Sequence, residues 1–167
     1  MANPQERHLI FREYLDAVGL HGLAGAQAAG LNATEWYALS QVGLAASLTS
    51  GELASRTGMS TGATTRLIDR LERAGYVRRT TDPADRRKVV VEQVPNATAR
   101  IDEIVGPARH KITAILARYT PEQVDLLFDY FAHAAPAYRE ATEEIRGTAL
   151  RTPPAASAAT AAPGAPP

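Results

Sequence analysis

The stretch TSGELASRTGMSTGATTRLIDRLERAGYVRRTTDPADRRKVVVEQ, residues 49–93, decides the fold of this chain. It contains two short helical patterns joined by a tight turn, and then two strand patterns joined by a charged hairpin. A helix-turn-helix followed by a β-wing is an arrangement that enters the grooves of nucleic acid. The segments before and after it have the patterns of long helices, which would hold two copies of the module apart.

The boundaries of the two short helices are marked by local signals. Thr49 and Glu52 form a capping box, and Gly58 suits the left-handed position that ends the first helix. Ser60 then caps a second helix, which ends before Gly75. Residues at helical spacing form a buried stripe on this second helix. They are Thr64, Leu67, Ile68, Leu71 and Ala74.

The opposite face of the second helix is small and hydroxylated near its start and basic further along. Its members are Thr61, Gly62, Thr65, Arg66, Asp69 and Arg73. Small residues let a helix approach the major groove, and arginine can donate two hydrogen bonds to a guanine. Alone, Arg66, Arg70 and Arg73 would more often be solvated cations on an exposed helix. The turn before them and the wing after them favour groove binding.

The wing is predicted as strands over residues 76–81 and 86–93, joined by the turn Asp82-Pro83-Ala84-Asp85. In the second strand Val89 and Val91 share one side, with Lys88, Val90 and Glu92 on the other. Three adjacent cations gather at the tip, where a narrow minor groove would attract them. They are Arg86, Arg87 and Lys88. A charged hairpin tip is usually only a solvated turn, but behind a helix-turn-helix it favours a minor-groove probe.

Charge is distributed unevenly along the chain. The 167 residues carry 18 basic and 18 acidic side chains. Residues 60–88 hold seven Arg and one Lys against four acidic residues, a net charge of +4, so the remainder carries −4. A basic module on an acidic body suits a protein that touches DNA with one face only.

Several classes of protein are disfavoured. There are no cysteines, hence no disulfides or thiolate metal sites. No apolar run approaches the roughly 20 residues of a membrane span, and the N-terminus lacks a signal-peptide pattern, so we expect a cytoplasmic protein. The four histidines have no metal spacing, and no nucleophile–base pair or phosphate loop is present. We therefore expect no enzyme activity, catalytic residue, cofactor or metal.

The segments before the module also have helical patterns. Residues 5–29 form a helical region in which four glycines predict a kink, a looser helix or close packing. They are Gly19, Gly22, Gly25 and Gly30. Asn32 and Glu35 form a capping box, and Leu31 with Trp36 fits a hydrophobic staple. This helix is expected to run to about residue 46 and to bury Trp36, Leu39 and Val42.

The segments after the wing are expected to be helical as well. Asn96 is predicted to cap a long helix that Gly106-Pro107 kinks. Thr120-Pro121-Glu122-Gln123 begins the next helix, and Pro136 is expected to break it. The buried side of that helix is predicted as Val124, Leu127, Phe128 and Phe131. Residues 148–167 are Ala/Pro-rich and are predicted to be a disordered tail.

These patterns predict a mainly α fold with a small β-wing, in which a winged helix-turn-helix lobe is joined to an α-helical dimerisation region. The expected division has four parts. They are an N-terminal dimerisation helix region at 5–30, the DNA-binding lobe at 31–94, C-terminal dimerisation helices at 95–147 and the tail at 148–167.

Two runs resemble the MarR family of bacterial transcriptional regulators. They are Leu71-Glu72-Arg73-Ala74-Gly75-Tyr76-Val77 and Asp82-Pro83-Ala84-Asp85-Arg86-Arg87, and the helix opening Leu31-Asn32-Ala33-Thr34-Glu35-Trp36 also matches. The resemblance implies a homodimer that binds a pseudopalindromic operator, with Asp85 as the wing-stabilising aspartate and Arg87 as the minor-groove arginine. One departure is Val94-Pro95-Asn96-Ala97, where the family usually has Leu-Thr-x-x-Gly.

The residues expected to bind double-stranded DNA follow from the helix face and the wing tip. They are Ser60, Thr61, Gly62, Thr65, Arg66, Arg70, Arg86, Arg87 and Lys88. The resemblance further implies a repressor released by a small aromatic or phenolic effector, for which His21, Trp36 and Tyr37 lie nearest the expected place. Two alternatives stay open at this point: a winged-helix module that binds another protein, and a constitutive DNA-binding protein without an effector.

Overall fold

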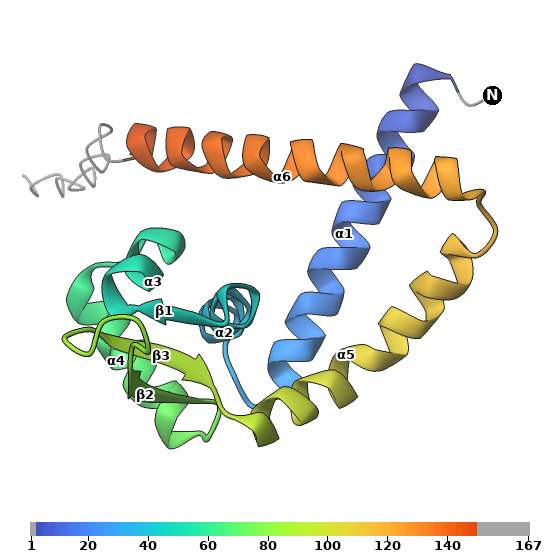
Figure 1. The fold of residues 1–167 in the computed structure, drawn as a ribbon. Helices are drawn as coiled ribbons and strands as arrows, with labels where there is room; N and C mark the ends of the chain where they lie inside the picture. The colour runs from blue at the N-terminus through green and yellow to red at the C-terminus, as the bar shows by residue number, and fades with distance from the viewer. Residues whose placement is uncertain (1–2, 150–167) are drawn as a thin grey trace, which may run out of the picture. The chain divides into compact units, whose positions relative to one another are not determined.

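A computed structural model describes residues 3–149 of the chain (Figure 1). The elements in order are α1 (Pro4–Ala28), α2 (Ala33–Ala45), β1 (Ser47–Thr49), α3 (Ser50–Thr57), α4 (Thr61–Arg73), β2 (Val77–Thr81), β3 (Val89–Gln93), α5 (Pro95–Leu116) and α6 (Pro121–Ala149). The predicted fold class, mainly α with a small β-wing, is confirmed. Contacts divide the chain into two units, residues 1–112 and 113–167.

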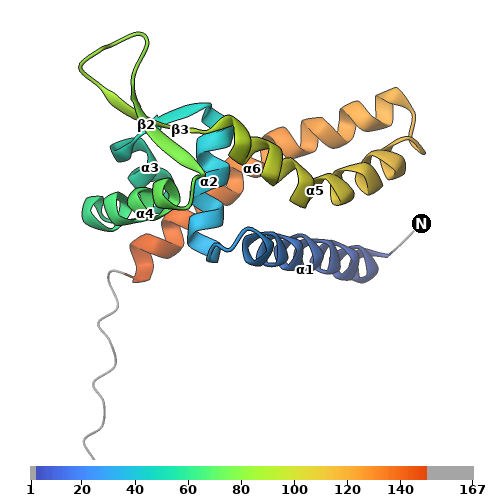
Figure 2. The same ribbon diagram turned by 90° about the horizontal axis from the view of Figure 1, so that it is seen from below.

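The sheet of the first unit has three antiparallel strands in the order β1-β3-β2. β3 lies in the centre, where Val91 pairs with Leu48 of β1 on one side and with Arg79 of β2 on the other. The strand β1 was not predicted, because three residues are too short to show an alternating pattern. The loop between β2 and β3 extends away from the helices of the lobe as the wing (Figure 2).

The core of the lobe lies where α2, α3 and α4 meet the sheet. Its largest fully buried side chains are Tyr76, Leu39, Leu53, Leu67, Ile68, Leu71, Val42, Val77, Val91 and Thr64. The stripe predicted on α4 is therefore confirmed at four of its five positions. Ala74 is exposed because it lies at the C-cap, where the helix has already ended. In β3, Val90 and Val91 are both buried and Val89 is exposed, since Val89 lies at the wing end of the strand, beyond the core.

The glycines of α1 do not interrupt the helix, but one of them permits close packing. A Cβ atom on Gly25 would lie 2.9 Å from Cζ2 of Trp36, so only glycine allows α1 this near to the ring. At Gly19 and Gly22 a Cβ would meet nothing within 4 Å. Trp36 itself is half-buried rather than buried, which corrects the prediction. Leu39 and Val42 are buried as expected.

The helix α5 begins two residues earlier than a cap at Asn96 predicts. Pro95 occupies the first helical position, where a missing N–H costs nothing, and the carbonyl of Val94 accepts the N–H groups of Ala97 at 2.9 Å and Thr98 at 3.2 Å. Asn96 therefore lies inside the helix and does not cap it. The helix is continuous through Pro107, where a kink was predicted, and Figure 1 shows it bending along its course.

The second unit contains the whole of α6, whose start agrees with the prediction. The N–H of Thr120 donates to Oε1 of Gln123 at 3.0 Å, and the N–H of Gln123 donates to the hydroxyl of Thr120 at 3.3 Å. Pro136 does not break this helix, contrary to the prediction. The carbonyl of Ala132, which loses its N–H partner, belongs to an exposed residue that water can reach.

The side of α6 predicted to be buried is not buried in the single chain. Phe128 and Phe131 are exposed and meet edge-to-face, with ring centroids 6.0 Å apart. Val124 and Leu127 are half-buried. The predicted tail overlaps α6 at residues 148 and 149, and its remainder lies outside the described residues. Between residues 3 and 149, no helix combines the length and the apolar character needed to cross a membrane.

Candidate nucleic-acid interface

The direction of α4 is fixed by the turn that precedes it. The N–H of Thr49 donates to Glu52 at 2.7 Å, and the N–H of Glu52 donates to the hydroxyl of Thr49 at 3.2 Å, which confirms the capping box. Gly58 has φ +68°, the left-handed conformation that suits glycine at a helix end. Ser60 then caps α4, since its hydroxyl oxygen accepts the N–H of Ala63 at 3.4 Å.

The first turns of α4 expose a face of small and hydroxylated residues. Thr61, Gly62 and Thr65 are all exposed, and the hydroxyl of Thr65 donates to the carbonyl of Thr61 at 3.0 Å. A Cβ on Gly62 would lie 3.9 Å from Nη1 of Arg66, so the Arg66 guanidinium lies back along the helix over this glycine. Within residues 3–149, Arg66 has no ion-pair or hydrogen-bond partner through its side chain. Its donors are free for a ligand.

The turn of the wing is held by two aspartates. Asp82 Oδ1 accepts the N–H of Ala84 at 2.7 Å, as in an Asx turn. Asp85 accepts twice, with Oδ1 from the N–H of Arg87 at 3.1 Å and with its carbonyl from the N–H of Lys88 at 2.9 Å. Because these bonds keep residues 85–88 in the turn, the second strand begins at Val89 and not at residue 86 as predicted.

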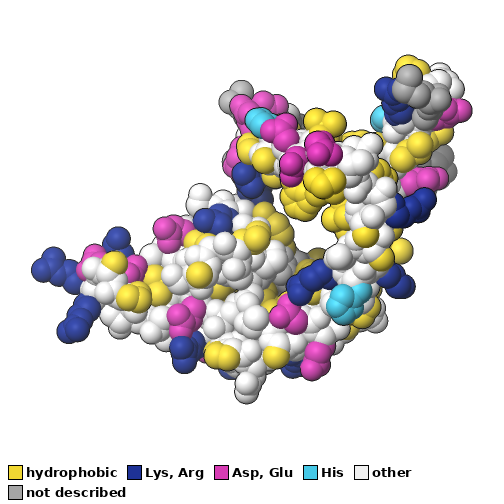
Figure 3. Space-filling model, turned by 45° about the vertical axis from the view of Figure 1, so that its right-hand side comes forward, with side chains coloured by type: hydrophobic (Ala, Val, Ile, Leu, Met, Phe, Trp, Pro, Cys, Tyr) yellow, Lys and Arg dark blue, Asp and Glu magenta, His cyan; other side chains and the backbone are white. Residues whose placement is uncertain are grey.

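The three cations of the wing therefore lie in the turn and project from it. Arg86, Arg87 and Lys88 are exposed, and the two arginine side chains form no hydrogen bond or ion pair in the described part of the chain. Lys88 is close enough to Glu52 to contribute, after the hydrogen bonds from Thr49, to lowering the pKa of that carboxyl. Figure 3 shows Lys and Arg side chains protruding from the end of the lobe at its left edge.

The structure places Arg70 differently from the other predicted DNA ligands. Its Nε lies 2.5 Å from Oε1 of Glu35, on α2. Burial raises the pKa of Glu35, but the N–H of Asn32 and the guanidinium of Arg70 outweigh burial, so the pKa lies below its usual value. Arg70 therefore joins α4 to α2 through its Nε, while its side chain stays 47% exposed.

A second arginine, which was not predicted, joins α4 to the wing. Arg79 of β2 binds Asp69 and Glu72 of α4 through its guanidinium, and its backbone N–H donates to Oε1 of Glu72 at 3.1 Å. Its neighbour Arg78 pairs across the sheet with Glu92 of β3 at 2.6 Å. Glu72 and Arg79 are seven residues apart, with the end of a helix and the start of a strand between them. This spacing is the sequence signal that could have predicted the ion pair.

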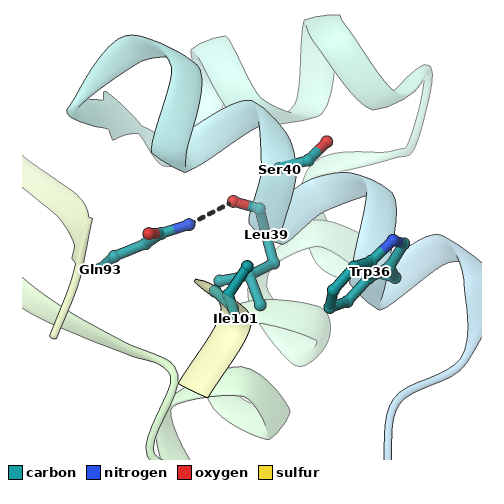
Figure 4. Close-up of a pocket in the computed structure, with 5 residues that line it drawn as sticks. All are labelled: Trp36, Leu39, Ser40, Gln93 and Ile101. Carbon is teal, nitrogen blue, oxygen red and sulfur yellow. Dashed lines mark hydrogen bonds between the residues drawn. The ribbon is translucent and has the colours of Figure 1, made fainter. Parts of the chain in front are cut away.

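Of the three residues predicted near an effector, Trp36 lines a small hollow in the described part of the chain. A hollow of about 40 Å³ is lined by Trp36, Leu39, Ser40, Gln93 and Ile101 (Figure 4). Its wall is fixed by the side-chain amide of Gln93, which donates to the carbonyl of Leu39 at 2.9 Å. His21 and Tyr37 are exposed and do not line it. Across residues 3–149 there is no group of three or more His, Cys, Asp or Glu that could hold a metal ion.

Comparisons with known proteins agree with this geometry. The family model described as MarR family matches residues 29–88. The chain is 36% identical over 137 residues to the HTH-type transcriptional regulator YcgE of Bacillus subtilis (strain 168), covering 82% of this chain and 89% of that protein. It is 32% identical over 75 residues to the HTH-type transcriptional repressor YetL of the same strain, covering 45% of each.

A solved structure shares the fold. A MarR family protein from Bacillus stearothermophilus superimposes with a TM-score of 0.61 at 19% identity, over 83% of this chain and 99% of that one. The fold, the exposed basic face of α4 with its wing, and the long similarity to YcgE lead to one conclusion. The chain belongs to the MarR family of transcriptional regulators, which bind DNA through a winged helix-turn-helix.

Proposed function

We propose that this protein is a homodimeric repressor that binds a pseudopalindromic operator with α4 in the major groove and the wing in the minor groove. The observation that carries the proposal is that some arginines of the lobe are paired with carboxylates and others are not. Arg70, Arg78 and Arg79 are paired with carboxylates, whereas Arg66, Arg86 and Arg87 have exposed side chains without such partners among residues 3–149. Arg66 lies on α4 and the other two lie at the wing tip, where the two grooves would meet them.

The two sets of contacts serve different purposes. Thr61, Gly62, Thr65 and Arg66 lie where a small helix face can approach base edges, so they would contribute sequence preference. The wing cations would contribute attraction to phosphates and to a narrow minor groove. Ser60 is engaged in capping, and its exposed position suits a phosphate contact.

A second copy is needed to place two recognition helices about 34–36 Å apart, one turn of DNA. The 25-residue helix α1 buries only Gly25 and Ala26 within the chain and exposes large apolar residues along its length. They are Leu9, Ile10, Tyr14, Leu15, Val18, Leu20 and Leu23. Such a surface is unusual for a monomer, and it supports dimerisation through residues 5–30 and 95–147.

DNA selected from a random pool with the full chain provides the operator on which the contacts are tested. We expect Arg87→Ala to weaken binding and to reduce the slope of log affinity against log salt by about one, because one phosphate-region cation is lost. We expect Arg66→Ala to relax base preference and to cost about 1–3 kcal/mol if it binds a guanine. Arg12→Ala, which removes an exposed arginine from α1, is the charge control. Unchanged affinity and salt slope in both variants would rule out groove binding by these elements.

We further propose that a small aromatic acid or phenol binds beside Trp36 and lowers DNA affinity. The hollow there lies among α2, the end of β3 and the start of α5, but its 40 Å³ is far below the roughly 300 Å³ of a ligand pocket. An effector would therefore have to displace a wall, and that displacement would change the course of α5. This is a route by which a ligand could alter the spacing of the recognition helices.

Titration of operator binding against aromatic carboxylates and phenols tests the effector. A coupling of about 1–3 kcal/mol would lower DNA affinity 5–150-fold, and the operator must weaken ligand binding by the same factor. Trp36, the single tryptophan, reports binding by its fluorescence. Compounds that bind the free protein and the operator complex equally well are not effectors. If every binder behaves in this way, the protein binds DNA constitutively.

A further inference from the structure

We propose that Arg79 is a positioning residue for DNA binding, which holds the wing at a fixed angle to α4 through Asp69 and Glu72. The proposal rests on the groove-binding function proposed above and adds a residue that does not itself touch DNA. It also explains why α4, the helix proposed to enter the DNA groove, carries the two carboxylates of Asp69 and Glu72 one turn apart.

The attachment has three points. Nη2 of Arg79 lies 2.5 Å from Oδ1 of Asp69, and Nη1 binds Oε2 of Glu72. The backbone N–H of Arg79 donates to Oε1 of the same glutamate at 3.1 Å. The planar guanidinium therefore spans two acceptors that lie three residues apart on one helix, while Glu72 binds both the side chain and the main chain of the strand. A guanidinium bound at two points fixes the direction of the wing relative to α4 as well as its distance. A single lysine ammonium group would fix only the distance.

The place of Arg79 in the sheet makes this attachment effective. Arg79 is the middle residue of β2 and pairs with Val91 of β3, the central strand. An anchor at this point restrains both strands that carry the wing turn. Arg78, the preceding residue, points to the other face and pairs with Glu92 within the sheet, so it does not restrain the wing against α4.

Stability alone does not explain the cluster. The three side chains are 32%, 47% and 39% exposed for Arg79, Asp69 and Glu72, and ion pairs at such exposure contribute little to folding. Asp69 follows Arg66 by one turn on the helix that we place in the major groove, where unpaired carboxylates would repel phosphates. Pairing with Arg79 removes that repulsion and converts the two carboxylates into anchors for the wing.

The angle between wing and helix is measurable in the free protein. The sequence has no cysteine, so Ala74→Cys at the end of α4 and Ala84→Cys in the wing turn allow selective spin labelling. Pulsed electron–electron double resonance measures the distance between the two labels. In the chain with no other substitution, this distance should have a narrow distribution. Arg79→Gln should broaden or shift it, whereas the matched Arg78→Gln should not. An unchanged distribution in Arg79→Gln would overturn the proposal.

Binding to the selected operator gives a second test, in which two explanations predict opposite signs. If Arg79 contacts phosphate directly, Asp69→Ala with Glu72→Ala frees it and removes two negative charges, so affinity should rise. If Arg79 positions the wing, the same double variant removes the anchors, so affinity should fall by about fivefold or more. Arg79→Gln added to that background should then have little further effect.

These outcomes separate failure of this inference from failure of the proposed function. Loss of binding in Arg87→Ala without loss in Arg79→Gln keeps groove binding and rejects the positioning role. No loss in Arg66→Ala, Arg87→Ala or Arg79→Gln rejects groove binding, and the spin-label distances still report whether Arg79 holds the wing. A circular dichroism melt of each variant confirms that measurements are made on folded protein.

Discussion

At the scale of single residues, Tyr76 joins three parts of the first unit. Its buried hydroxyl donates to the carbonyl of Ala29 at 2.6 Å, its own carbonyl accepts the N–H of Val94 at 3.1 Å, and the guanidinium carbon of Arg100 lies 5.2 Å from its ring centroid. These contacts reach the end of α1, the end of β3 and the helix α5. Tyr76 therefore holds the DNA-binding lobe to the helices that we assign to dimerisation.

Removing only the hydroxyl isolates the first of these contacts. Tyr76→Phe should lower the free energy of unfolding by about 1–3 kcal/mol, because the buried carbonyl of Ala29 loses its donor. Denaturant titration measures the change. Tyr37→Phe, which removes an exposed hydroxyl, should leave stability unaltered. Equal stability of the two variants would show that the Tyr76 hydroxyl contributes nothing.

Glu35 gives a pH-dependent contribution at the same scale. Its pKa lies below the usual value, despite the opposing effect of burial, because Asn32 donates to it and Arg70 pairs with it. The stabilisation is therefore complete above the unfolded glutamate pKa of about 4.3 and is lost as pH falls through the lower folded value. Glu35→Gln should be less stable than the unchanged chain by about 1 kcal/mol at neutral pH, with the difference vanishing in acid. Denaturant curves from pH 7 to pH 3 would show it, with the exposed Glu103→Gln as the control.

At the scale of elements, the packing of α1 on α2 depends on the missing side chain of Gly25. Gly25→Ala adds about 1 kcal/mol of helix propensity but places a Cβ 2.9 Å from the Trp36 ring, so we expect net destabilisation. Gly19→Ala gains the same propensity in open space and should be neutral or stabilising. Tryptophan fluorescence should shift in the first variant only. Stabilisation by Gly25→Ala would mean that the ring moves aside freely.

At the scale of the whole molecule, exposed apolar surface predicts self-association. Sedimentation of the full chain at micromolar concentration without DNA should show a dimer. Ile10→Glu, which places a charge among the exposed apolar residues of α1, should shift the equilibrium toward monomer, because a buried unpaired carboxylate is costly. Gln5→Glu adds the same charge at an exposed polar position of that helix. A monomeric unchanged chain would contradict the dimer.

The sequence alone determined the features whose causes lie within a few residues. Thr49 with Glu52, Asn32 with Glu35, and Thr120 with Gln123 cap their helices as predicted, because each side chain binds an N–H three residues away. The stripe of α4 follows from helical spacing, and the wing turn follows from Asp82. The order of these signals was enough for a winged helix-turn-helix.

Tertiary structure decided which cations are free and which helices are covered. Arg70 and Arg66 have the same chemistry on the same helix, yet Arg70 finds Glu35 at a separation of 35 residues and Arg66 finds no partner in the described chain. Trp36 is half-buried because α1 packs on it through Gly25, and Pro136 leaves α6 intact because the carbonyl that it deprives belongs to an exposed residue. Helical spacing identifies the apolar side of an element, but it does not tell which other element packs against that side. Burial and ion pairing depend on that neighbour, which only the folded chain brings close.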